Sequence, residues 1–491
     1  MSSAARYCHR CGLRRRGSLW KPLVGLPGSE LMAIRTVSEH QRRFLLVGGI
    51  VAGVLLLVAP ILPLTAAIGL ATAVYLASLA YRLLMFRAAL GAPETVVVDD
   101  AEARAIPSRQ LPAYTILVPA YREPEVIADL LNSLSQIDYP AHRLDIKLLL
   151  EADDPDTLAA VTEAKPGANV EVLRVLPSEP RTKPKACNVG LGRARGKFVT
   201  IYDAEDRPDP LQLRRSVAAF KRLPSDVACL QAKLSYHNAE QNLLTKWFTA
   251  EYALWFGQFL PGLIKLGAPV PLGGTSNHFR RDLLVKLGGW DPYNVTEDAD
   301  LGTRLHRLGF RTGVLDSITL EEANSDFVNW MKQRSRWYKG YLQTWLVHMR
   351  HPRRLWQQIG ARGFVGFNLF VGGTPLLALI NPLFWALTAI WFIAKPPVIL
   401  ELFPAWLYYS SLVCLALGNF TFLYTAVVGA RAAGKPGLAL AALLSPLYWV
   451  MMSIAAVKAA IQLLAAPTFW EKTAHGLDRA VPPPERDHVA A

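Results

Sequence analysis

Acidic side chains recur in the centre of the sequence wherever a short β-rich run ends. Three successive runs, YTILVPAY, IKLLLEA and GKFVTIY, lead into Glu123, into Asp153 and Asp154, and into Asp203, Glu205 and Asp206. Asp and Glu also favour helix N-caps and turns, which is the structural alternative for any one of them. Their repetition at successive strand ends favours a shared site for a divalent cation and a diphosphate, whose charge such a cation neutralises.

Two further acids open a predicted helix farther along the chain. In VTEDADLGTRLHRLGF, Glu297 and Asp298 precede leucines that recur with helical spacing. Asp298 could cap that helix. A carboxylate at the rim of the same crevice can also accept the proton of an attacking hydroxyl group. We expect the second role, general base, for Asp298.

A segment rich in Trp and Arg, NWMKQRSRWYKGYLQTW, is predicted to be a helix. Gln333, Arg336 and Trp337 share one face of it, because residues three and four positions apart are neighbours on a helix. Arg can pair bidentately with a diphosphate, and Trp offers a flat surface on which a sugar ring stacks. The alternative is an aromatic belt with basic anchors at a membrane surface.

The elements that must position these residues alternate between strand and helix from Ala113 onward. This order predicts an α/β fold with a doubly wound sheet, which binds its ligand at the carboxyl ends of the strands. No G-x-G-x-x-G or Walker A sequence follows the first strand. Dinucleotide and ATP sites are therefore disfavoured.

Apolar stretches flank this domain on both sides. Those at 44–64, 65–86, 376–394 and 402–428 are long enough to cross a bilayer, and Arg82 interrupts the second. The stretches at 355–370 and 438–464 carry polar groups and could lie in the membrane interface instead, so we expect four to six spans. Asn368, Asn381, Trp385 and Asn419 are candidates for the lining of a path between the spans.

The charges indicate orientation rather than nucleic-acid binding. Apolar residues make up 52% of the 491 residues, charged residues 19%, and the net charge is +14. Basic residues cluster before the first span and after the second, which places the N-terminus and the central domain in the cytoplasm. Basic tracts interleaved with base-stacking aromatic residues are missing, which argues against nucleic acid as a partner. Cys8-x-x-Cys11 lacks the second pair of ligands that a zinc ribbon needs, so we expect no zinc.

Taken in order, these motifs resemble the membrane-integrated family 2 glycosyltransferases, which include the processive synthases of cellulose, hyaluronan and curdlan. VPAYREPEVI is similar to the family's uridine-binding strand and loop, and LLLEADDPDT to its next nucleotide-binding segment. KPKACNVGL resembles the Lys-Ala-x-Asn element, YDAED the metal-binding Asp-x-Asp, and GGTSNHFRRD the acceptor-side element. Thr-Glu-Asp and a full Gln-x-x-Arg-Trp follow, and the resemblance covers about residues 113–345.

The resemblance implies a role for each matching residue. Asp298 is the implied base, and Asp203 with Glu205 the implied ligands of Mg²⁺ or Mn²⁺. Because relatives carry Asp where this chain has Glu205, Asp206 could share that role. The implied contacts of donor and acceptor are Tyr121, Glu123, Asp153 or Asp154, Lys185, Glu297, Gln333, Arg336 and Trp337.

A last motif, PTFWEKTAHG, looks like the gating segment that follows an interface helix in cellulose synthases and closes over the nucleotide. Lys472, Thr473 and His475 are its candidate phosphate ligands. An ordinary juxtamembrane tail is the alternative.

We therefore expect a GT-A-like α/β transferase domain at 110–345, inserted between membrane segments. A basic cytoplasmic segment at 1–43 and two spans at 44–87 precede the domain; interface and spanning helices at 355–465 and a cytoplasmic gating segment at 466–491 follow it. The expected activity is inverting, processive transfer from a UDP-sugar, with UDP-glucose favoured, into a β-linked exopolysaccharide exported across the bacterial inner membrane. Accessory export subunits could assist.

Two other functions compete with this one. A non-processive transferase would add one sugar to a lipid carrier and export nothing. A transporter with a nucleotide-sensing domain comes from a different class of protein and would need no general base.

Overall fold

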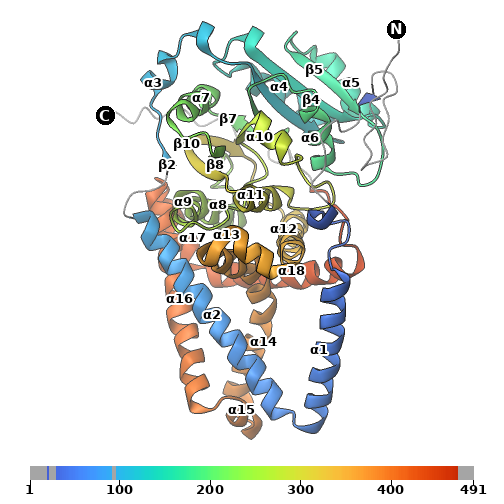
Figure 1. The fold of residues 1–491 in the computed structure, drawn as a ribbon. Coiled ribbons are helices and arrows are strands. Elements are labelled where there is room, and N and C mark those ends of the chain that lie inside the picture. Colours follow the sequence, from blue (N-terminus) through green and yellow to red (C-terminus); the bar gives the residue numbers. More distant parts are fainter. Residues whose placement is uncertain (1–18, 21–28, 91–94, 474–491) are drawn as a thin grey trace.

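The computed structural model describes residues 19–20, 29–90 and 95–473, which form two parts stacked end to end (Figure 1). A bundle of long apolar helices forms one part, and an α/β domain lies on one end of it. Cys8, Cys11 and His475, to which the sequence analysis assigned or denied roles, lie outside the described residues.

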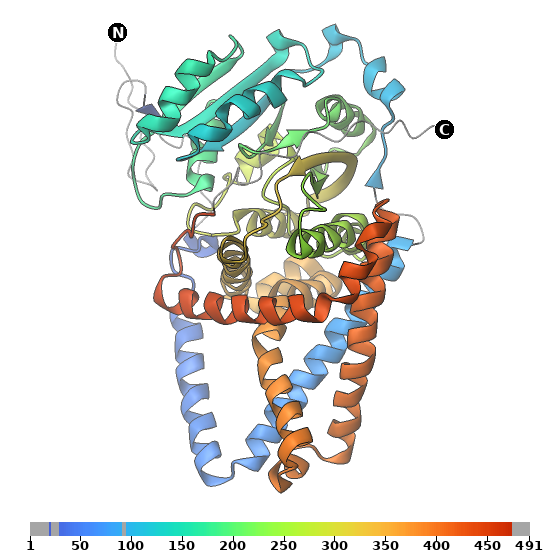
Figure 2. The ribbon, with the colours of Figure 1, turned by 180° about the vertical axis from the view of Figure 1, so that it is seen from behind.

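Four apolar helices run along the length of the bundle (Figures 1 and 2). They are α1 (Glu39–Val58), α2 (Ile61–Leu90), α14 (Gly373–Ala394) and α16 (Ala405–Ala432). The first apolar stretch was expected to continue to residue 64, but α1 ends before Pro60, which has no backbone N–H with which to continue a helix. The short helix α15 (Pro397–Leu402) joins α14 to α16 at the end far from the α/β domain (Figure 1).

Two helices lie across the bundle, at its junction with the α/β domain: α13 (Pro352–Phe367) and α18 (Ser445–Ala465) (Figure 1). In the described part of the chain, five helical stretches are long and apolar enough to cross a membrane, and α18 is one of them. Its position across the other helices agrees with an interfacial location. Lys458 and Gln462 give α18 a polar side, on which both bind Glu471.

One mixed sheet forms the centre of the α/β domain, with the strand order β1-β5-β4-β3-β6-β9-β8-β10-β2 and with β7 beside β10. The strands are β1 (Leu19–Trp20), β2 (Thr95–Val96), β3 (Tyr114–Ala120), β4 (Leu144–Glu151), β5 (Val170–Val175), β6 (Phe198–Ile201), β7 (Arg207–Pro208), β8 (Val227–Tyr236), β9 (Asn277–Arg280) and β10 (Arg311–Glu321). The strands from β5 to β6 along this order are parallel neighbours, as the alternation of strands and helices predicted. By contrast, β9 runs antiparallel to both β6 and β8, which that alternation did not predict.

Helices cover both faces of the sheet. Neighbouring residues of one strand enter different cores: Ile116 packs in the first and Leu117 in the second, and Leu148 and Leu149 divide in the same way. Successive side chains of a strand point to opposite faces, so a sheet buried on both sides reads as continuous apolar runs. Against the first core pack α4 (Ile127–Ser135), α5 (Pro155–Ala164) and α7 (Gln212–Arg222), and against the second α6 (Lys183–Leu191) and α11 (Glu297–Arg307).

Two helices connect the α/β domain to the bundle, α8 (Leu243–Leu254) and α12 (Phe327–His348). Asp326 caps α12 by accepting a hydrogen bond of 2.8 Å from the backbone N–H of Asn329. Trp330 and Tyr338 of α12 then pack in one apolar cluster with Ala455 and Ala459 of α18. The Gln-x-x-Arg-Trp motif is thereby held at the junction of the two parts.

Candidate active site

The elements that carry the predicted site residues open into one cavity of about 1520 Å³. Its wall includes the end of β3, the loop after β6, the start of α11, one face of α12 and the chain after α18. The predicted residues that line it are Tyr121, Glu123, Asp203, Glu205, Glu297, Asp298, Gln333, Arg336, Trp337, Lys472 and Thr473. Motifs from both ends of the transferase segment and from the C-terminal segment therefore share one site.

Asp154 does not line this cavity. It is 3% exposed and caps α5 by accepting from the backbone N–H of Thr157. Its other oxygen accepts from the backbone N–H of Arg122, which has a left-handed φ of 54°. Asp154 therefore fixes the loop that carries Tyr121 and Glu123.

Asp153 and Lys185 also lie outside the lining. The carboxylate of Asp153 pairs with Arg181 at 2.7 Å, and Arg181, which lines the cavity, donates to the hydroxyl of Tyr121. Lys185 is buried and pairs at 2.9 Å with Glu151, which does line the cavity. Both residues position their neighbours in the wall.

The acids after β6 divide between the cavity and the interior. Asp203 and Glu205 line the cavity. Asp206 is buried instead: it accepts from the backbone N–H of Asp203 at 2.7 Å and from the hydroxyl of Thr275. Asp206 thus holds the loop, and Glu205 takes the position in the wall.

Lys183 lies among these acids. Its ammonium pairs with Asp203 and donates to the carbonyl oxygen of Gly274 at 2.8 Å. Burial raises the pKa of Glu205 well above its ordinary value, and the negative charges of Asp203 and Glu123 raise it further. The site therefore concentrates acidic groups whose charge Lys183 offsets in part.

This donor set fits a divalent cation. Asp203 and Glu205 supply carboxylate oxygens, the ligands that Mg²⁺ and Mn²⁺ prefer, and their mutual repulsion falls when a cation binds. Asp206 Oδ1 is buried and has no hydrogen-bond partner within the described residues. Across residues 29–90 and 95–473, however, no three His, Cys, Asp or Glu side chains already form a metal-binding group, so side chains or phosphate oxygens must complete the coordination.

Asp298 stands in the first turn of α11, where it lines the cavity. The N-cap position belongs to Thr296, whose side chain makes no capping hydrogen bond, so Asp298 does not cap the helix. Burial raises the pKa of Asp298 to about 6 and that of Glu297 to about 8, the latter with a contribution from the charge of Asp298. A base with a pKa near the working pH can both hold and release a proton.

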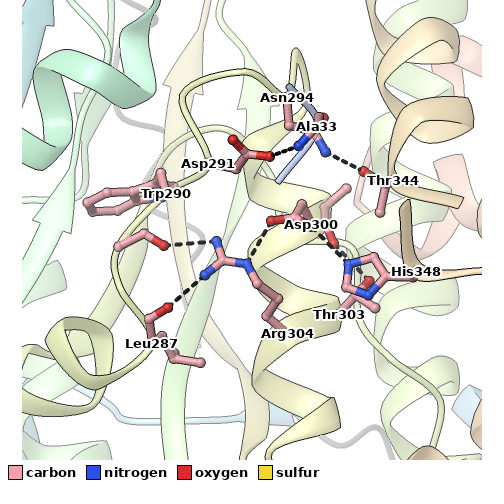
Figure 3. A network of polar contacts seen from close by, with 12 residues as sticks. Ala33, Leu287, Trp290, Asp291, Asn294, Asp300, Thr303, Arg304, Thr344 and His348 are labelled. Atoms are coloured by element: carbon pink, nitrogen blue, oxygen red, sulfur yellow. Dashed lines mark hydrogen bonds and ion pairs between the residues drawn. The ribbon is translucent and has the colours of Figure 1, made fainter. Parts of the chain in front are cut away.

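A buried polar network holds α11 in place (Figure 3). Asp300 accepts from Arg304 at 2.7 Å and lies 2.9 Å from Nε2 of His348 on α12. Arg304 also donates to the backbone oxygens of Leu287 and Gly289. The first turn of α11, with Asp298, is thus fixed against both α12 and the preceding loop.

Residues 466–473, which we call the strap, cross this site and are bound by α12. Gln343 donates to the carbonyl oxygen of Pro467 at 2.8 Å, and Lys339 donates to that of Phe469 at 2.5 Å. At the far end of the strap, Lys472 pairs with Glu123 at 3.4 Å and also donates to the backbone oxygen of Tyr121. The strap therefore connects the Gln-x-x-Arg-Trp helix to the loop after β3.

Trp337 is held from two sides. Its ring stacks on Tyr252 with a centroid distance of 6.4 Å and an interplanar angle of 12°. The guanidinium of Arg334 lies 4.7 Å from the same ring and pairs through both nitrogens with Glu251 of α8. Glu251 and Arg334 line the cavity too.

The cavity continues from this site between the apolar helices. Asn381, Trp385 and Asn419 line it, as expected for a path between the spans. Asn368 is outside its lining and instead accepts from Trp345 at 2.9 Å. At the end near α15, several lining side chains are exposed, among them Phe392 at 72% and Tyr409 at 64%.

Sequence reasoning missed several charged residues of the wall, among them Arg82, Lys183, Glu251 and Arg334. Lys183 stands in the quoted KPKACNVGL, where Lys185 was chosen of the two lysines. Arg82 was noted only as an interruption of an apolar stretch, although an ionisable residue in a span is itself a functional signal. For Glu251, no local pattern singles it out.

Part of the chain is similar in sequence to known glycosyltransferases. Residues 112–340 match the family described as glycosyltransferase like family 2. The mannosyltransferase PcManGT from Pyrobaculum calidifontis, solved in complex with GDP-Man and Mn²⁺, has a similar structure with a TM-score of 0.53. At 20% identity over 82% of this chain and 99% of that chain, this likeness concerns the fold.

Two curated relatives are similar to about half of the chain. A probable glycosyltransferase of Bacillus subtilis, YdaM, is 27% identical over 235 residues, which are 47% of this chain and 56% of that protein. The beta-monoglucosyldiacylglycerol synthase of Trichormus variabilis is 28% identical over 261 residues, 51% of this chain and 54% of that protein. The chain thus spans about half the length of the curated relatives it matches.

Proposed function

We propose that this chain, whose residues 112–340 match the family described as glycosyltransferase like family 2, transfers a single hexose, with inversion, from a nucleoside diphosphate sugar to a hydroxyl group of a membrane lipid. This proposal departs from the processive polysaccharide synthesis expected from the motifs. One observation carries it: the cavity that holds Asp298 extends between the apolar helices and ends among exposed side chains near α15. A lipid can enter such a cavity from the bilayer.

The relatives support a lipid acceptor. The synthase of Trichormus variabilis is named for a glycolipid product, beta-monoglucosyldiacylglycerol. By analogy we propose a glucose or related hexose as the transferred sugar. The mannosyltransferase with a similar fold was solved with GDP-Man, so UDP is proposed here from the motif resemblance alone.

The chemistry we propose is a single displacement. The acceptor oxygen attacks the anomeric carbon while the bond from that carbon to the diphosphate oxygen breaks, and the electron pair of that bond leaves with the nucleoside diphosphate. Asp298 accepts the proton of the acceptor hydroxyl. Attack from the face opposite the leaving group inverts the configuration, so an α-linked donor yields a β-linked product.

Positive groups in the cavity wall stabilise the leaving diphosphate in this proposal. Lys183 and Arg336 both line the cavity, and both interact electrostatically with Asp203 and Glu297. A cation on Asp203 and Glu205 would add Lewis-acid stabilisation of the diphosphate charge. Arg336 and Lys183 hold fixed positive charge at the site in either case.

We place four helices, α1, α2, α14 and α16, across the bacterial cell membrane, with the transferase domain in the cytoplasm. Arg42, Arg43, Arg87 and Arg431 stand at the ends of these helices that meet the α/β domain (Figure 1). Lys395, at the opposite end, follows α14. This bias follows the positive-inside rule.

A polymer acceptor is the second candidate. Trp337 lines the cavity together with Trp385, Trp391 and Tyr408 farther along it, and aromatic rings at intervals can stack successive sugars. A path of this kind would pass a growing chain across the membrane. Product size separates the two candidates.

The test is incubation of the purified chain, in lipid nanodiscs, with a panel of radiolabelled nucleotide sugars. We expect one labelled lipid that carries one hexose and moves with the organic phase on extraction. A water-soluble labelled polymer would favour the second candidate. Release of nucleoside diphosphate without any glycosylated product would contradict both.

A further inference from the structure

The part of the cavity between the apolar helices contains a charge that the proposed transfer does not use. Arg82 lies on α2, eight positions before the helix ends at Leu90, and it lines the cavity. An ionisable side chain within a span is costly unless a partner or ligand compensates it. The partners of Arg82 therefore decide what it does.

No carboxylate in the described part of the chain forms an ion pair with Arg82. Its Nη2 donates to the hydroxyl of Thr374 at 3.3 Å, and its guanidinium faces three aromatic rings, at 5.0 Å from Phe422, 5.8 Å from Phe259 and 6.0 Å from Phe370. Aromatic faces attract a cation but do not neutralise it. The net positive charge of Arg82 thus remains inside the cavity.

The nearby acid, Glu251, is already bound. Its carboxylate accepts two hydrogen bonds from Arg334, at 2.7 Å and 2.5 Å, and one from Tyr448 at 2.8 Å. Arg334 is buried beside Glu251, and breaking this ion pair would leave both charges without a partner in the interior, which is costly. Glu251 is therefore the counterion of Arg334 rather than of Arg82.

A second group points to a ligand at the same place. Ser78 is 4% exposed, lines the cavity, and its hydroxyl has no hydrogen-bond partner within the described residues. Ser78 lies four positions before Arg82 on α2, so both side chains are on one face of the helix. A buried hydroxyl left without a partner costs free energy, which a ligand that accepts its hydrogen bond would recover.

From this arrangement we propose that Arg82, Ser78 and Thr374 bind the phosphate group of the lipid acceptor. A guanidinium and two hydroxyl groups are three donors for one compact anion, and Arg matches phosphate oxygens with two parallel hydrogen bonds. The inference rests on the proposed transfer to a lipid and names the class of that lipid.

The different positions of Arg82 and Asp298 along the cavity add a second requirement for the acceptor. Arg82 is on the bundle helix α2, whereas Asp298 is on α11 within the α/β domain (Figure 1). Both residues line the same cavity. A lipid whose phosphate is bound at Arg82 extends toward Asp298 only by what lies beyond the phosphate. The acceptor is therefore a phospholipid whose headgroup carries a free hydroxyl group, such as phosphatidylglycerol, and not diacylglycerol.

Lipid retention in the absence of donor tests the phosphate site independently of activity. The full chain is solubilised with one of three tritiated lipids with identical acyl chains: phosphatidylglycerol, phosphatidylmethanol, which has a phosphate but no free hydroxyl, and diacylglycerol. We expect both phosphate lipids to be retained at least about tenfold better than diacylglycerol, the size of one charge-assisted contact. Glycerol 3-phosphate, added as a free competitor, distinguishes lipid binding from binding of any phosphate ester.

Variants assign the effect to the residues. Arg82→Gln and Ser78→Ala should each reduce the preference for phosphate lipids, whereas Arg87→Gln should not, because Arg87 is an exposed arginine of the same helix outside the cavity. An unchanged unfolding temperature and an unchanged donor affinity show that a variant is folded. If Arg82→Gln does not fold, Ser78→Ala tests the site in its place. The phosphate site is overturned if Arg82→Gln and Ser78→Ala retain phosphate lipids as well as Arg87→Gln does. It is also overturned if the wild type retains diacylglycerol as well as the phosphate lipids.

Transfer assays on the same samples separate this inference from the proposed function. If the wild type glycosylates phosphatidylglycerol and Arg82→Gln does so more slowly, the result supports both the phosphate site and the proposed transfer to a lipid. Glycosylation of diacylglycerol, unaffected by Arg82→Gln, leaves transfer to lipid in place and overturns the inference. A polymer product with phosphate-lipid retention still dependent on Arg82 overturns transfer to lipid and leaves only the phosphate site.

Discussion

The guanidinium Nη1 of Arg336 donates a hydrogen bond of 3.2 Å to the backbone carbonyl oxygen of Glu471. A residue of the Gln-x-x-Arg-Trp motif thus holds the strap directly. The carboxylate of Glu471 in turn accepts from Lys458 at 2.8 Å and from Gln462 at 2.9 Å, both on α18. Glu471 therefore joins the active site to the helix that lies along the base of the α/β domain.

Glu471→Ala should loosen the strap. With Lys458 and Gln462 unpaired, the strap keeps its backbone contacts with α12 but holds Lys472 less firmly against the loop after β3. We expect the dissociation constant of the nucleotide sugar to rise about tenfold, in line with one or two charge-assisted hydrogen bonds, and limited proteolysis within 466–473 to accelerate. Glu401→Ala, which removes an exposed acid of α15, is the matched control. Equal proteolysis rates in both variants would show that Glu471 does not hold the strap.

Asp298→Asn should abolish transfer but not donor binding. Asn keeps the shape and one acceptor oxygen but cannot take a proton, and loss of a general base commonly costs about 10²–10⁴ in rate. Calorimetry of nucleotide-sugar binding beside turnover measures both effects. A parallel loss of donor affinity would assign Asp298 to the donor or cation site instead.

The rate should also depend on pH through Asp298. Burial raises its pKa to about 6, and only the deprotonated carboxylate accepts a proton. We therefore expect kcat/KM to fall as the pH drops below about 6 and to level off above it. A rate that is constant from pH 5 to 8 would exclude a titrating base in this range.

Removal of divalent cations should stop transfer. EDTA should abolish turnover and added Mg²⁺ or Mn²⁺ should restore it, because Asp203 and Glu205 offer the oxygen ligands that these cations prefer. Asp203→Asn should stay inactive at every metal concentration, whereas Asp282→Asn, a change at a side chain that is 87% exposed, should behave as the wild type. Full activity in EDTA would contradict the cation site.

Gly340→Ala should displace the start of α11. A Cβ at position 340 of α12 would overlap Oγ1, Cγ2 and Cβ of Thr296, the residue before Glu297 and Asp298. Overpacking of this kind costs about 1–3 kcal/mol, so both the unfolding temperature and turnover should fall. Gly257→Ala, where a Cβ meets nothing within 4 Å, is the control. Identical activity of the two variants would show that the position of Thr296 does not matter.

Much of the α/β domain could be predicted from local sequence patterns. The runs YTILVPAY, IKLLLEA and GKFVTIY all contain strands, namely β3, β4 and β6, and Glu297 does begin a helix. These elements are long, periodic and bounded by turn residues, so short-range physics specifies them. The antiparallel strand β9 escaped prediction, because four residues carry no directional signal and only pairing with β6 and β8 fixes their course.

The candidate site was predictable only in part, for a related reason. A motif identifies residue types, but Asp154 and Asp203 differ in which way their side chains face, and burial decides that: Asp154 caps α5, whereas Asp203 lines the cavity. Glu251 joins the wall through contacts between helices far apart in the chain. Such contacts leave no local pattern.

The structure of the product is the decisive evidence for a single inverting transfer to a lipid. The purified chain in nanodiscs that contain phosphatidylglycerol is supplied with the nucleotide sugar that the panel selects, and the extracted product is analysed by mass spectrometry and by the proton coupling at its anomeric carbon. We expect a lipid heavier by one hexose, with a β-glycosidic linkage from an α-linked donor, and no such product from Asp298→Asn. An α-linked product, or a polymer free of lipid, would contradict it.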